Sequence, residues 1–333
     1  MKQYTVAVLG ATGAVGREML RVLQERAFPV GKLIPLGSER SAGTFLSFAG
    51  EQIPVQVAAK EAFAGVDLVL GAADNRTALN FAPAIVEAGA VFVDNSSAFR
   101  QYPEVPLVVP EINPEDVKSH KGIISNPNCT TAISLTAIAP LRALSPIKSI
   151  WAATYQAVSG AGIEGPAELQ QQVQALLGGE KYTPKVFPCQ IAYNLIPRIG
   201  EHQELGYTSE EMKLQYEGRK ILHQPELTVS CTCVRVPVMR SHSVSASICF
   251  ESHVEVAAAR EILAAAPGCR LLDDLEQEVY PTPLQSSDQD LVLVGRIRPD
   301  LTDANRLNLW CCGDQLRKGA ATNAVQIAQL LVK

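Results

Sequence analysis

Hydrophobic and polar positions along the first part of the chain follow two alternating patterns. Short runs of apolar and β-branched residues predict buried strands, and longer segments with apolar residues at helical spacing predict helices. The expected strands cover residues 4–9, 32–36, 66–72, 91–94 and 123–125, and the expected helices cover residues 18–25 and 78–88. Strands that alternate with helices in this way predict an α/β fold with a Rossmann-like, doubly wound parallel sheet.

The pattern changes after Ser149, where the β-rich runs become longer and predict an α+β domain on a mixed or antiparallel sheet. The last residues, 318–331, have the spacing of an amphipathic helix that would return to pack on the first domain. We therefore expect one domain of residues 1–127 completed by 314–333, and a second of residues 128–313. The expected elements of the second domain are strands at 228–236 and 243–250 and helices at 167–177 and 257–265.

Composition narrows the class of protein. The chain has 333 residues, of which 47% are hydrophobic and 19% charged, so it is a globular protein rather than a disordered one. Its net charge of −5 provides no basic surface for nucleic acid or an anionic membrane, and no apolar run is long enough to cross a bilayer. The expected partner is a small molecule, and without a signal sequence the expected location is the cytoplasm.

The eight cysteines indicate free thiols in a reducing compartment rather than a metal site. They stand at positions 129, 189, 231, 233, 249, 269, 311 and 312, and no C-x-x-C pair or His/Cys spacing suits zinc. We expect no metal cofactor.

A glycine turn separates the first expected strand from the first expected helix. Its sequence is Gly10-Ala11-Thr12-Gly13-Ala14-Val15-Gly16. Glycines allow backbone to approach a phosphate closely, and the helix N-terminus supplies N–H donors and a positive dipole end for a pyrophosphate. The turn predicts dinucleotide binding, and a glycine turn without a ligand is the alternative. The candidate contacts are Gly10, Thr12, Gly13, Ala14 and Val15.

The turn after the second expected strand favours NADP over NAD. NAD sites usually place an acidic residue there for the ribose hydroxyls, whereas a 2′-phosphate needs cations and hydroxyls. Arg40 can form a bidentate contact to phosphate, and Ser38 and Ser41 can donate to it. Glu39 is an acidic residue in the same turn and favours NAD instead. The alternative to a cofactor contact is that this turn is only a charged, solvated surface segment.

Cys129 follows the expected strand at 123–125 and opens an apolar helical segment, within Ser125-Asn-Pro-Asn-Cys-Thr-Thr131. A helix N-terminus favours the thiolate, which is the reactive form of cysteine. Cys129 is therefore a candidate nucleophile, although a small buried residue is the usual role of a cysteine.

Two further segments supply groups that a nucleophile needs. His242 begins the expected strand at 243–250, and a histidine suits a general base near neutral pH. Gln156 ends a strand before a flexible polar turn that contains Ser159 and Gly160, and its amide could orient a carbonyl. A structural histidine and an ordinary loop are the alternatives.

Six separated segments together resemble the signatures of the aspartate-β-semialdehyde dehydrogenase family. They occur in the family's order and run from one end of the chain to the other. The segments are Gly10-Ala-Thr-Gly-Ala-Val-Gly16, Asp94-Asn-Ser-Ser-Ala-Phe-Arg100, Ser125-Asn-Pro-Asn-Cys-Thr-Thr131, Gln156-Ala-Val-Ser-Gly-Ala-Gly162, Arg235-Val-Pro-Val with His242-Ser243, and Gly313-Asp-Gln-Leu-Arg-Lys-Gly-Ala-Ala321.

The resemblance implies a reversible, NADP-dependent oxidoreductase. In this family a cysteine attacks L-aspartate-4-semialdehyde, a hydride passes to NADP, and phosphate releases the acyl thioester as L-aspartyl-4-phosphate. The physiological direction is the reverse reduction, which leads to lysine (through diaminopimelate), threonine and methionine. The family also implies a homodimer.

The resemblance assigns roles to individual residues. Cys129 would be the nucleophile, His242 the acid/base and Gln156 the residue that orients the acyl group. The substrate would be held by Arg100, Asn128, Glu210, Lys213 and Arg235, with Arg235 on its carboxylate. Ser159, Gly160 and Gln315 would lie on the nicotinamide side of the cofactor.

The chain departs from the family pattern in two places. It reads Gly71-Ala-Ala-Asp-Asn-Arg-Thr77 where the family carries a glycine-rich stretch, so Asp74 adds a negative charge near a phosphate site. Gln315 stands where an asparagine is common. Three rival functions stay open: a related thiol-dependent acyl-phosphate reductase, a nucleotide-binding paralogue with reduced activity, and a cysteine hydrolase.

Overall fold

The computed structural model describes residues 2–332, which form two compact units. The first unit runs to Asn128 and resumes at Ala320, and the second unit comprises Cys129–Gly319. Each unit has its own sheet, and the chain passes between the units next to the candidate nucleophile and again after Gly319.

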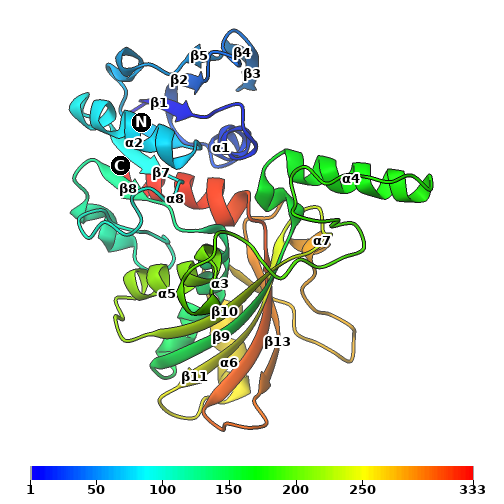
Figure 1. Cartoon of the computed structure of the whole chain (residues 1–333). Helices are drawn as coiled ribbons and strands as arrows, with labels where there is room; N and C mark the ends of the chain where they lie inside the picture. Colours follow the sequence, from blue (N-terminus) through cyan, green and yellow to red (C-terminus); the bar gives the residue numbers. More distant parts are fainter. Residues whose placement is uncertain (1, 333) are drawn as a thin grey trace. The chain divides into compact units, whose positions relative to one another are not determined.

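A six-stranded, all-parallel sheet forms the centre of the first unit, with the strand order β5-β2-β1-β6-β7-β8 (Figure 1). This order reverses between β1 and β6, as in doubly wound folds, so the predicted fold class is confirmed. The strands are β1 (Tyr4–Leu9), β2 (Val30–Gly37), β5 (Gln56–Val57), β6 (Leu68–Gly71), β7 (Val91–Asp94) and β8 (Ile123–Ser125). A separate hairpin of β3 (Phe45–Phe48) and β4 (Glu51–Pro54) was not predicted.

Three helices pack around this sheet: α1 (Ala14–Glu25), α2 (Asn75–Glu87) and α8 (Thr322–Leu331). Both α1 and α2 begin earlier than their periodicity predicts. Apolar side chains of α8, among them Val325 and Ile327, join those of α1 in one buried core. The single helix predicted over residues 318–331 is wrong at its start, because Arg317–Ala321 form a π-helical turn before α8.

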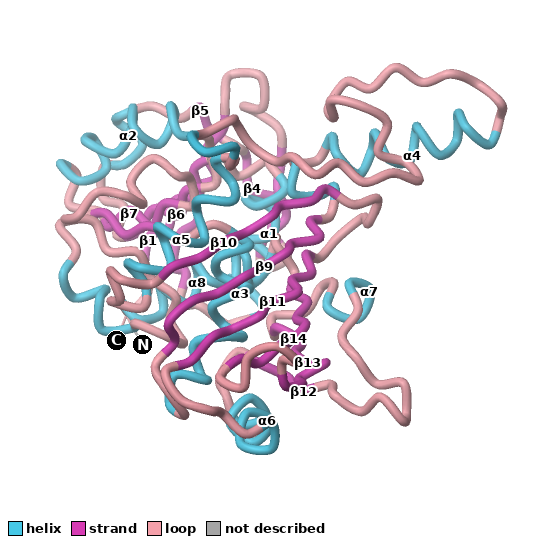
Figure 2. The backbone as a smooth tube through the Cα atoms, turned by 60° about the horizontal axis from the view of Figure 1, so that its bottom comes forward, coloured by secondary structure: helices cyan, strands magenta, loops and turns pink. Residues whose placement is uncertain are grey.

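The second unit is built on a six-stranded mixed sheet with the order β10-β9-β11-β14-β13-β12, whose strands lie side by side in Figure 2. The pairs β10–β9 and β12–β13 are parallel and the other three pairs are antiparallel. The mixed sheet predicted for this half is confirmed. Its strands are β9 (Ile147–Gln156), β10 (Thr228–Arg235), β11 (His242–Phe250), β12 (Cys269–Leu271), β13 (Val292–Pro299) and β14 (Arg306–Gly313).

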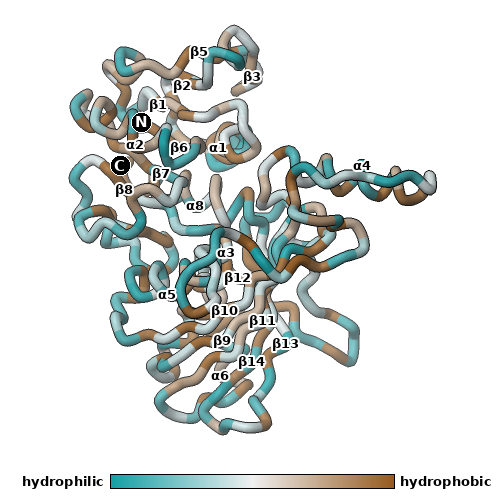
Figure 3. The backbone as a smooth tube through the Cα atoms, in the orientation of Figure 1, coloured by the Kyte–Doolittle hydropathy of each residue, from teal (hydrophilic) through white to brown (hydrophobic). Residues whose placement is uncertain are grey.

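Five helices belong to the second unit: α3 (Cys129–Ile138), α4 (Glu164–Leu177), α5 (Ser209–Ile221), α6 (Val256–Ala265) and α7 (Pro283–Ser286). Figure 3 shows hydrophilic and hydrophobic residues mixed along α4, which buries only one side. The turn after Gln156 was predicted to be flexible and polar. It is instead a 3-10 helix, Val158–Ala161, in which Val158 and Ser159 are buried.

Buried polar groups on α4 hold the following segment of chain. Glu168 and Gln172 accept hydrogen bonds from backbone N–H groups of residues 185–192 at 2.6–3.4 Å. Farther along, Ile196 pairs with Arg235 through two backbone hydrogen bonds of 2.9 and 3.0 Å. The end of β10 is therefore supported by a segment that α4 fixes.

All eight cysteines are free thiols. Among the residues that the structure describes, no helix has the length and apolar character needed to cross a membrane.

Candidate active site

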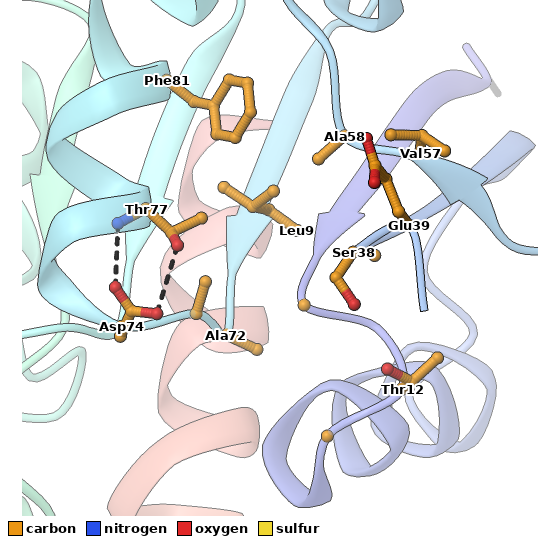
Figure 4. A pocket seen from close by; sticks show the side chains of 14 residues that line it. Leu9, Thr12, Ser38, Glu39, Val57, Ala58, Ala72, Asp74, Thr77 and Phe81 are labelled. Carbon is orange, nitrogen blue, oxygen red and sulfur yellow. Dashed lines mark hydrogen bonds between the residues drawn. The ribbon is translucent and has the colours of Figure 1, made fainter. Parts of the chain in front are cut away.

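A pocket of about 440 Å³ opens in the first unit at the carboxyl ends of β1, β2 and β6 (Figure 4). Parallel sheets of this kind bind ligands at that edge, where the strand order reverses. The lining residues are Leu9, Gly10, Thr12, Gly13, Gly37, Ser38, Glu39, Val57, Ala58, Ala72, Ala73, Asp74, Thr77 and Phe81.

Two glycines of the turn before α1 are required by their surroundings. Gly10 has φ +85°, and a Cβ there would lie 2.6 Å from the carbonyl oxygen of Ala72. A Cβ on Gly16 would lie 2.3 Å from the carbonyl oxygen of Gly10. Bare backbone at the start of α1 leaves its N–H groups and positive dipole end open to a phosphate.

The predicted cofactor residues of the first unit divide into two groups at this pocket. Those that line it are Gly10, Thr12, Gly13 and Ser38, whereas Ala14, Val15, Arg40 and Ser41 are not among its lining residues. The Ser41 hydroxyl donates to the carbonyl oxygen of Ser38 at 3.1 Å, and Arg40 is exposed. Glu39, the residue that argues against NADP, does line the pocket.

Asp74, the acidic departure from the family pattern, caps a helix. Its carboxylate accepts hydrogen bonds from the Thr77 backbone N–H at 2.9 Å and from the Thr77 hydroxyl at 3.2 Å (Figure 4). The backbone N–H of Thr77 is the main reason that the pKa of Asp74 lies below its usual value. The carboxylate is thus held against the N-terminus of α2, which explains why the helix begins at Asn75.

Arg100 is buried in the first unit beside the loop that carries Asn128. Its Nε donates to the carbonyl oxygen of Asn126 and its Nη2 to that of Asn95, both at 2.9 Å. Asn128 is also buried. Backbone carbonyls therefore fix the plane of the guanidinium group, and its charge also acts on the buried Asp94 carboxylate.

Cys129 is the first residue of α3 and the least buried one of that helix. Every following residue of α3, from Thr130 to Ile138, is buried. Gly319 packs against the nucleophile, because a Cβ there would lie 2.8 Å from Cys129 Cβ. The thiol thus stands at a helix N-terminus, partly accessible, against a glycine whose replacement would force a local shift.

His242 is fully buried at the start of β11. Its Nδ1 accepts the backbone N–H of Ala157 at 3.1 Å, and its Nε2 has no hydrogen-bond partner among the described residues. Burial, followed by the charge of Arg235, lowers the pKa of His242 to about 3. The ring is therefore neutral at pH 7, and since Nδ1 is an acceptor we assign its proton to Nε2.

This assignment predicts how stability depends on pH. An unfolded histidine takes up a proton near pH 6.5, whereas folded His242 does not, so the free energy of unfolding falls as pH drops below 6.5. Between pH 7 and 5 the loss reaches about 2 kcal/mol. Urea unfolding of wild type and His242→Gln at both pH values tests this. We expect a smaller loss in the variant, and equal losses would contradict the assignment.

Arg235 ends β10 and is buried beside His242. Its Nη1 donates to the carbonyl oxygen of Ala157 at 2.7 Å. Burial lowers the pKa of Arg235, and negative charge on Cys129 and Glu210 opposes that shift. A Cβ on Gly160 would lie 2.7 Å from Arg235 Nη1 and 3.2 Å from His242 Cε1, so Gly160 leaves room for both side chains.

A chain of polar side chains links β9 to the start of α5. Gln156 Nε2 donates to Glu210 at 3.2 Å, and Lys213 Nζ donates to the same carboxylate at 2.8 Å. Gln156 and Glu210 are buried, and Lys213 is half-buried. The Gln156 amide at the end of β9 thus meets the Glu210 carboxylate and the Lys213 ammonium group of α5.

Gln315 and Ser159 form a second polar contact in this unit. Gln315 Nε2 donates to the Ser159 hydroxyl, and Gln315 Oε1 accepts the backbone N–H of Ser241 at 2.8 Å. Both side chains are buried. The glutamine that replaces the usual asparagine therefore fits its surroundings with both ends of its amide paired.

The structure brings together, within the second unit, the predicted nucleophile, imidazole and substrate ligands: Cys129, Gln156, Glu210, Lys213, Arg235 and His242. The candidates Arg100 and Asn128 belong to the first unit. Sequence reasoning missed Ala157, whose backbone N–H binds His242 and whose carbonyl oxygen binds Arg235. Backbone groups could not be found from the sequence, because every residue has them.

Comparisons with known proteins agree with this chemistry. Residues 5–120 match the family model described as semialdehyde dehydrogenase, NAD binding domain, and residues 138–318 match semialdehyde dehydrogenase, dimerisation domain. Aspartate-semialdehyde dehydrogenase of Synechocystis sp. is 50% identical over 328 residues, covering 98% of this chain and 97% of the relative. That of Bacillus subtilis is 45% identical, with coverage of 98% and 97%.

Solved structures give the same result. Aspartate semialdehyde dehydrogenase II of Vibrio cholerae, complexed with ASA, has a TM-score of 0.97 and 42% identity and covers 100% of this chain and 99% of that one. The Candida albicans enzyme with NADP has a TM-score of 0.76 and 25% identity, with coverage of 99% and 98%. With a nucleotide pocket, a thiol at a helix N-terminus and these full-length relatives, the chain belongs to the aspartate-semialdehyde dehydrogenase family.

Proposed function

We propose that the family's reaction runs in this chain through an acyl thioester on Cys129. The physiological direction is NADPH-dependent reduction of L-aspartyl-4-phosphate to L-aspartate-4-semialdehyde and phosphate, on the way to lysine, threonine and methionine. One observation carries the proposal: the partly accessible Cys129 opens the buried helix α3, in a unit where Arg235 and His242 both border Gly160. A helix N-terminus and a buried cation both favour the thiolate.

The chemistry balances without a proton taken up by His242. In the oxidative direction the Cys129 thiolate adds to the aldehyde carbon, and the resulting alkoxide accepts a hydrogen bond from His242 Nε2–H. Loss of hydride from that carbon, for which NADP would be the acceptor, leaves the thioester. Hydrogen phosphate attacks the thioester carbonyl and gives up its proton to solvent, and departure of the Cys129 thiolate releases aspartyl phosphate. His242, predicted as an acid/base, is thus proposed to act mainly as a donor.

The substrate is an anion with one amino group, and the proposed ligands match its charges. Arg235 would hold the carboxylate in a bidentate contact, and Glu210 would accept the amino group. Arg100 and Lys213 would meet the phosphate. Gln156, with Asn128 beside the nucleophile, would orient the acyl group.

NADP is the proposed cofactor, and it supplies the chemistry of hydride transfer. The glycine cradle at the start of α1 and the pocket at the carboxyl ends of the parallel strands support a dinucleotide, and the Candida albicans relative was solved with NADP. The exposed Arg40, with Ser38 and Ser41, would hold the 2′-phosphate. Ser159, Gly160 and Gln315 would border the nicotinamide.

Arg40→Ala tests the choice of cofactor. A charge-assisted contact contributes about 1.5–3 kcal/mol, so we expect KM for NADP to rise roughly 10- to 100-fold. KM for NAD should stay within about 2-fold, because NAD lacks the 2′-phosphate. Glu39→Gln is the matched neighbouring control, for which KM for NADP should not rise. Equal changes for the two cofactors in Arg40→Ala would exclude a role on the 2′-phosphate.

We propose that the enzyme is a cytoplasmic homodimer. The match to a dimerisation domain and the free state of all eight thiols support this. On the sheet of the second unit, Trp151 and Tyr155 are exposed and offer apolar area for a second copy. The division into a cofactor domain (residues 1–127 with 314–333) and a catalytic, dimerisation domain (residues 128–313) is part of the same proposal.

Absorbance at 340 nm tests the proposed reaction. On mixing protein, NADP, phosphate and L-aspartate-4-semialdehyde, we expect NADPH to form and to require phosphate. N-acetyl-glutamyl semialdehyde and glyceraldehyde-3-phosphate should be poor substrates in the same assay. A folded, unmodified protein without a phosphate-dependent signal would overturn the proposal, and preference for another aldehyde would indicate a related reductase.

A further inference from the structure

Thr154 is a buried polar residue next to the proposed site that neither the sequence motifs nor the reaction accounts for. It lies on β9 two residues before Gln156, so both side chains point to the same face of the sheet. Its exposed fraction is 0%, and its Oγ1 lies 2.9 Å from Gln156 Oε1. Its hydroxyl also interacts with the thiol of Cys233, the residue paired with it on β10, and valine has the same shape without the hydroxyl.

The surroundings fix which end of the Gln156 amide faces Thr154. The Glu210 carboxylate accepts hydrogen bonds only, so the amide nitrogen must face it, as observed at 3.2 Å. The amide oxygen then faces the Thr154 hydroxyl, which donates to it. The amide is held at both ends, by an acceptor on α5 and a donor on β9.

The donor matters because Gln156 is 98% buried, with an exposed fraction of only 2%. An amide oxygen without a donor in such a place is costly, and the glutamine would relieve that cost by moving to another rotamer. Glu210 alone cannot prevent this, since it pairs only the nitrogen. Lys213 Nζ donates a hydrogen bond to the Glu210 carboxylate and so fixes the group that accepts from the Gln156 amide.

We propose that Thr154 is a positioning residue that holds the Gln156 amide in the orientation needed for acyl transfer and hydride transfer. The inference rests on the role of Gln156 in the proposed function. With its oxygen bonded to Thr154, Gln156 can present only N–H to the acyl oxygen, and an N–H donor stabilises the charge that develops there.

The test compares Thr154→Val, which removes only the donor, with Thr154→Ser, which keeps it. In the phosphate-dependent 340 nm assay we expect kcat of Thr154→Val to fall by about 10-fold or more, with KM for the semialdehyde changed less than about 3-fold. Thr154→Ser should keep kcat within about 3-fold of wild type. Wild-type kcat in Thr154→Val would overturn the inference.

A double-mutant cycle separates positioning from a general structural effect. In a Gln156→Ala background, Thr154→Val should change kcat by less than about 2-fold, because the group it acts on is gone. A full additional loss in that background would overturn the inference. Should Thr154→Val not fold, Thr154→Ser against Thr154→Ala gives the same comparison of hydroxyl and no hydroxyl. An inactive wild type would instead refute the proposed function, so the two failures are distinguishable.

Discussion

A Cys129→Ser variant will fold and bind NADP as wild type does, but it will form no thioester. A serine hydroxyl is a far weaker acid than a thiol and stays protonated near neutral pH, so the first bond to the substrate is not made. We expect kcat to fall by at least about 10³-fold in the 340 nm assay. Intact-protein mass spectrometry after mixing with semialdehyde and NADP, without phosphate, should show an acyl adduct on wild type only.

Cys189→Ser is the matched control, since Cys189 is an exposed thiol of the same unit. It should keep both the adduct and wild-type turnover. Turnover of Cys129→Ser near the wild-type rate, or an adduct mapped to another cysteine, would remove Cys129 from the mechanism.

Gly319→Ala is expected to have the second largest effect, although it adds a single methyl group far from Cys129 in sequence. The new Cβ would lie 2.8 Å from Cys129 Cβ and 3.2 Å from Cys129 Cα, so the start of α3 or the π-helical turn has to move. A displacement of the nucleophile by a fraction of an ångström to 1 Å costs about 10²-fold in rate. We expect kcat to fall by that amount and the rate of Cys129 alkylation to change with it.

Gly218→Ala is the control for the added methyl group. Gly218 is buried in α5, and its new Cβ would make an ordinary contact of 3.4 Å with the end of the Leu227 side chain. Activity should stay near that of wild type. Wild-type kcat in Gly319→Ala would show that the turn yields without disturbing the nucleophile.

Periodicity predicted most elements of the first unit and several of the second, but the 8-residue strands β13 and β14 were missed. It located all the strands of the parallel sheet except β5, which has only two residues, and it gave the correct type for α1, α2, α4 and α6. It failed where local chemistry decides a boundary. The start of α2 was placed at residue 78, because the capping role of the Asp74 carboxylate was not recognised; Asp74 also lines the pocket, as its predicted position near a phosphate site requires. The helix α5 was missed although Thr208 and Glu211 form a capping box that the sequence displays.

The sequence predicted which residues form the candidate site, but not the contacts between residues of different motifs. Cys129, Gln156 and His242 lie in short segments of the chain that the family resemblance covers. The contacts between them depend on the pairing of β11 with β9 and on the position of Ala157, whose backbone binds two of the site's side chains. The acid/base role of His242 stays a prediction, and the Ala157 N–H adds that the ring is held with Nδ1 as an acceptor.

The return of α8 to the first unit has a consequence for how the protein is made. Residues of α8, including Val325 and Ile327, complete a core whose other members were synthesised before Cys129. About 190 residues, Cys129–Gly319, are translated in between, which takes on the order of 10–40 s at ordinary rates of synthesis. The core of the first unit therefore stays open while Cys129–Gly319 are synthesised, and its apolar side chains are exposed during that interval.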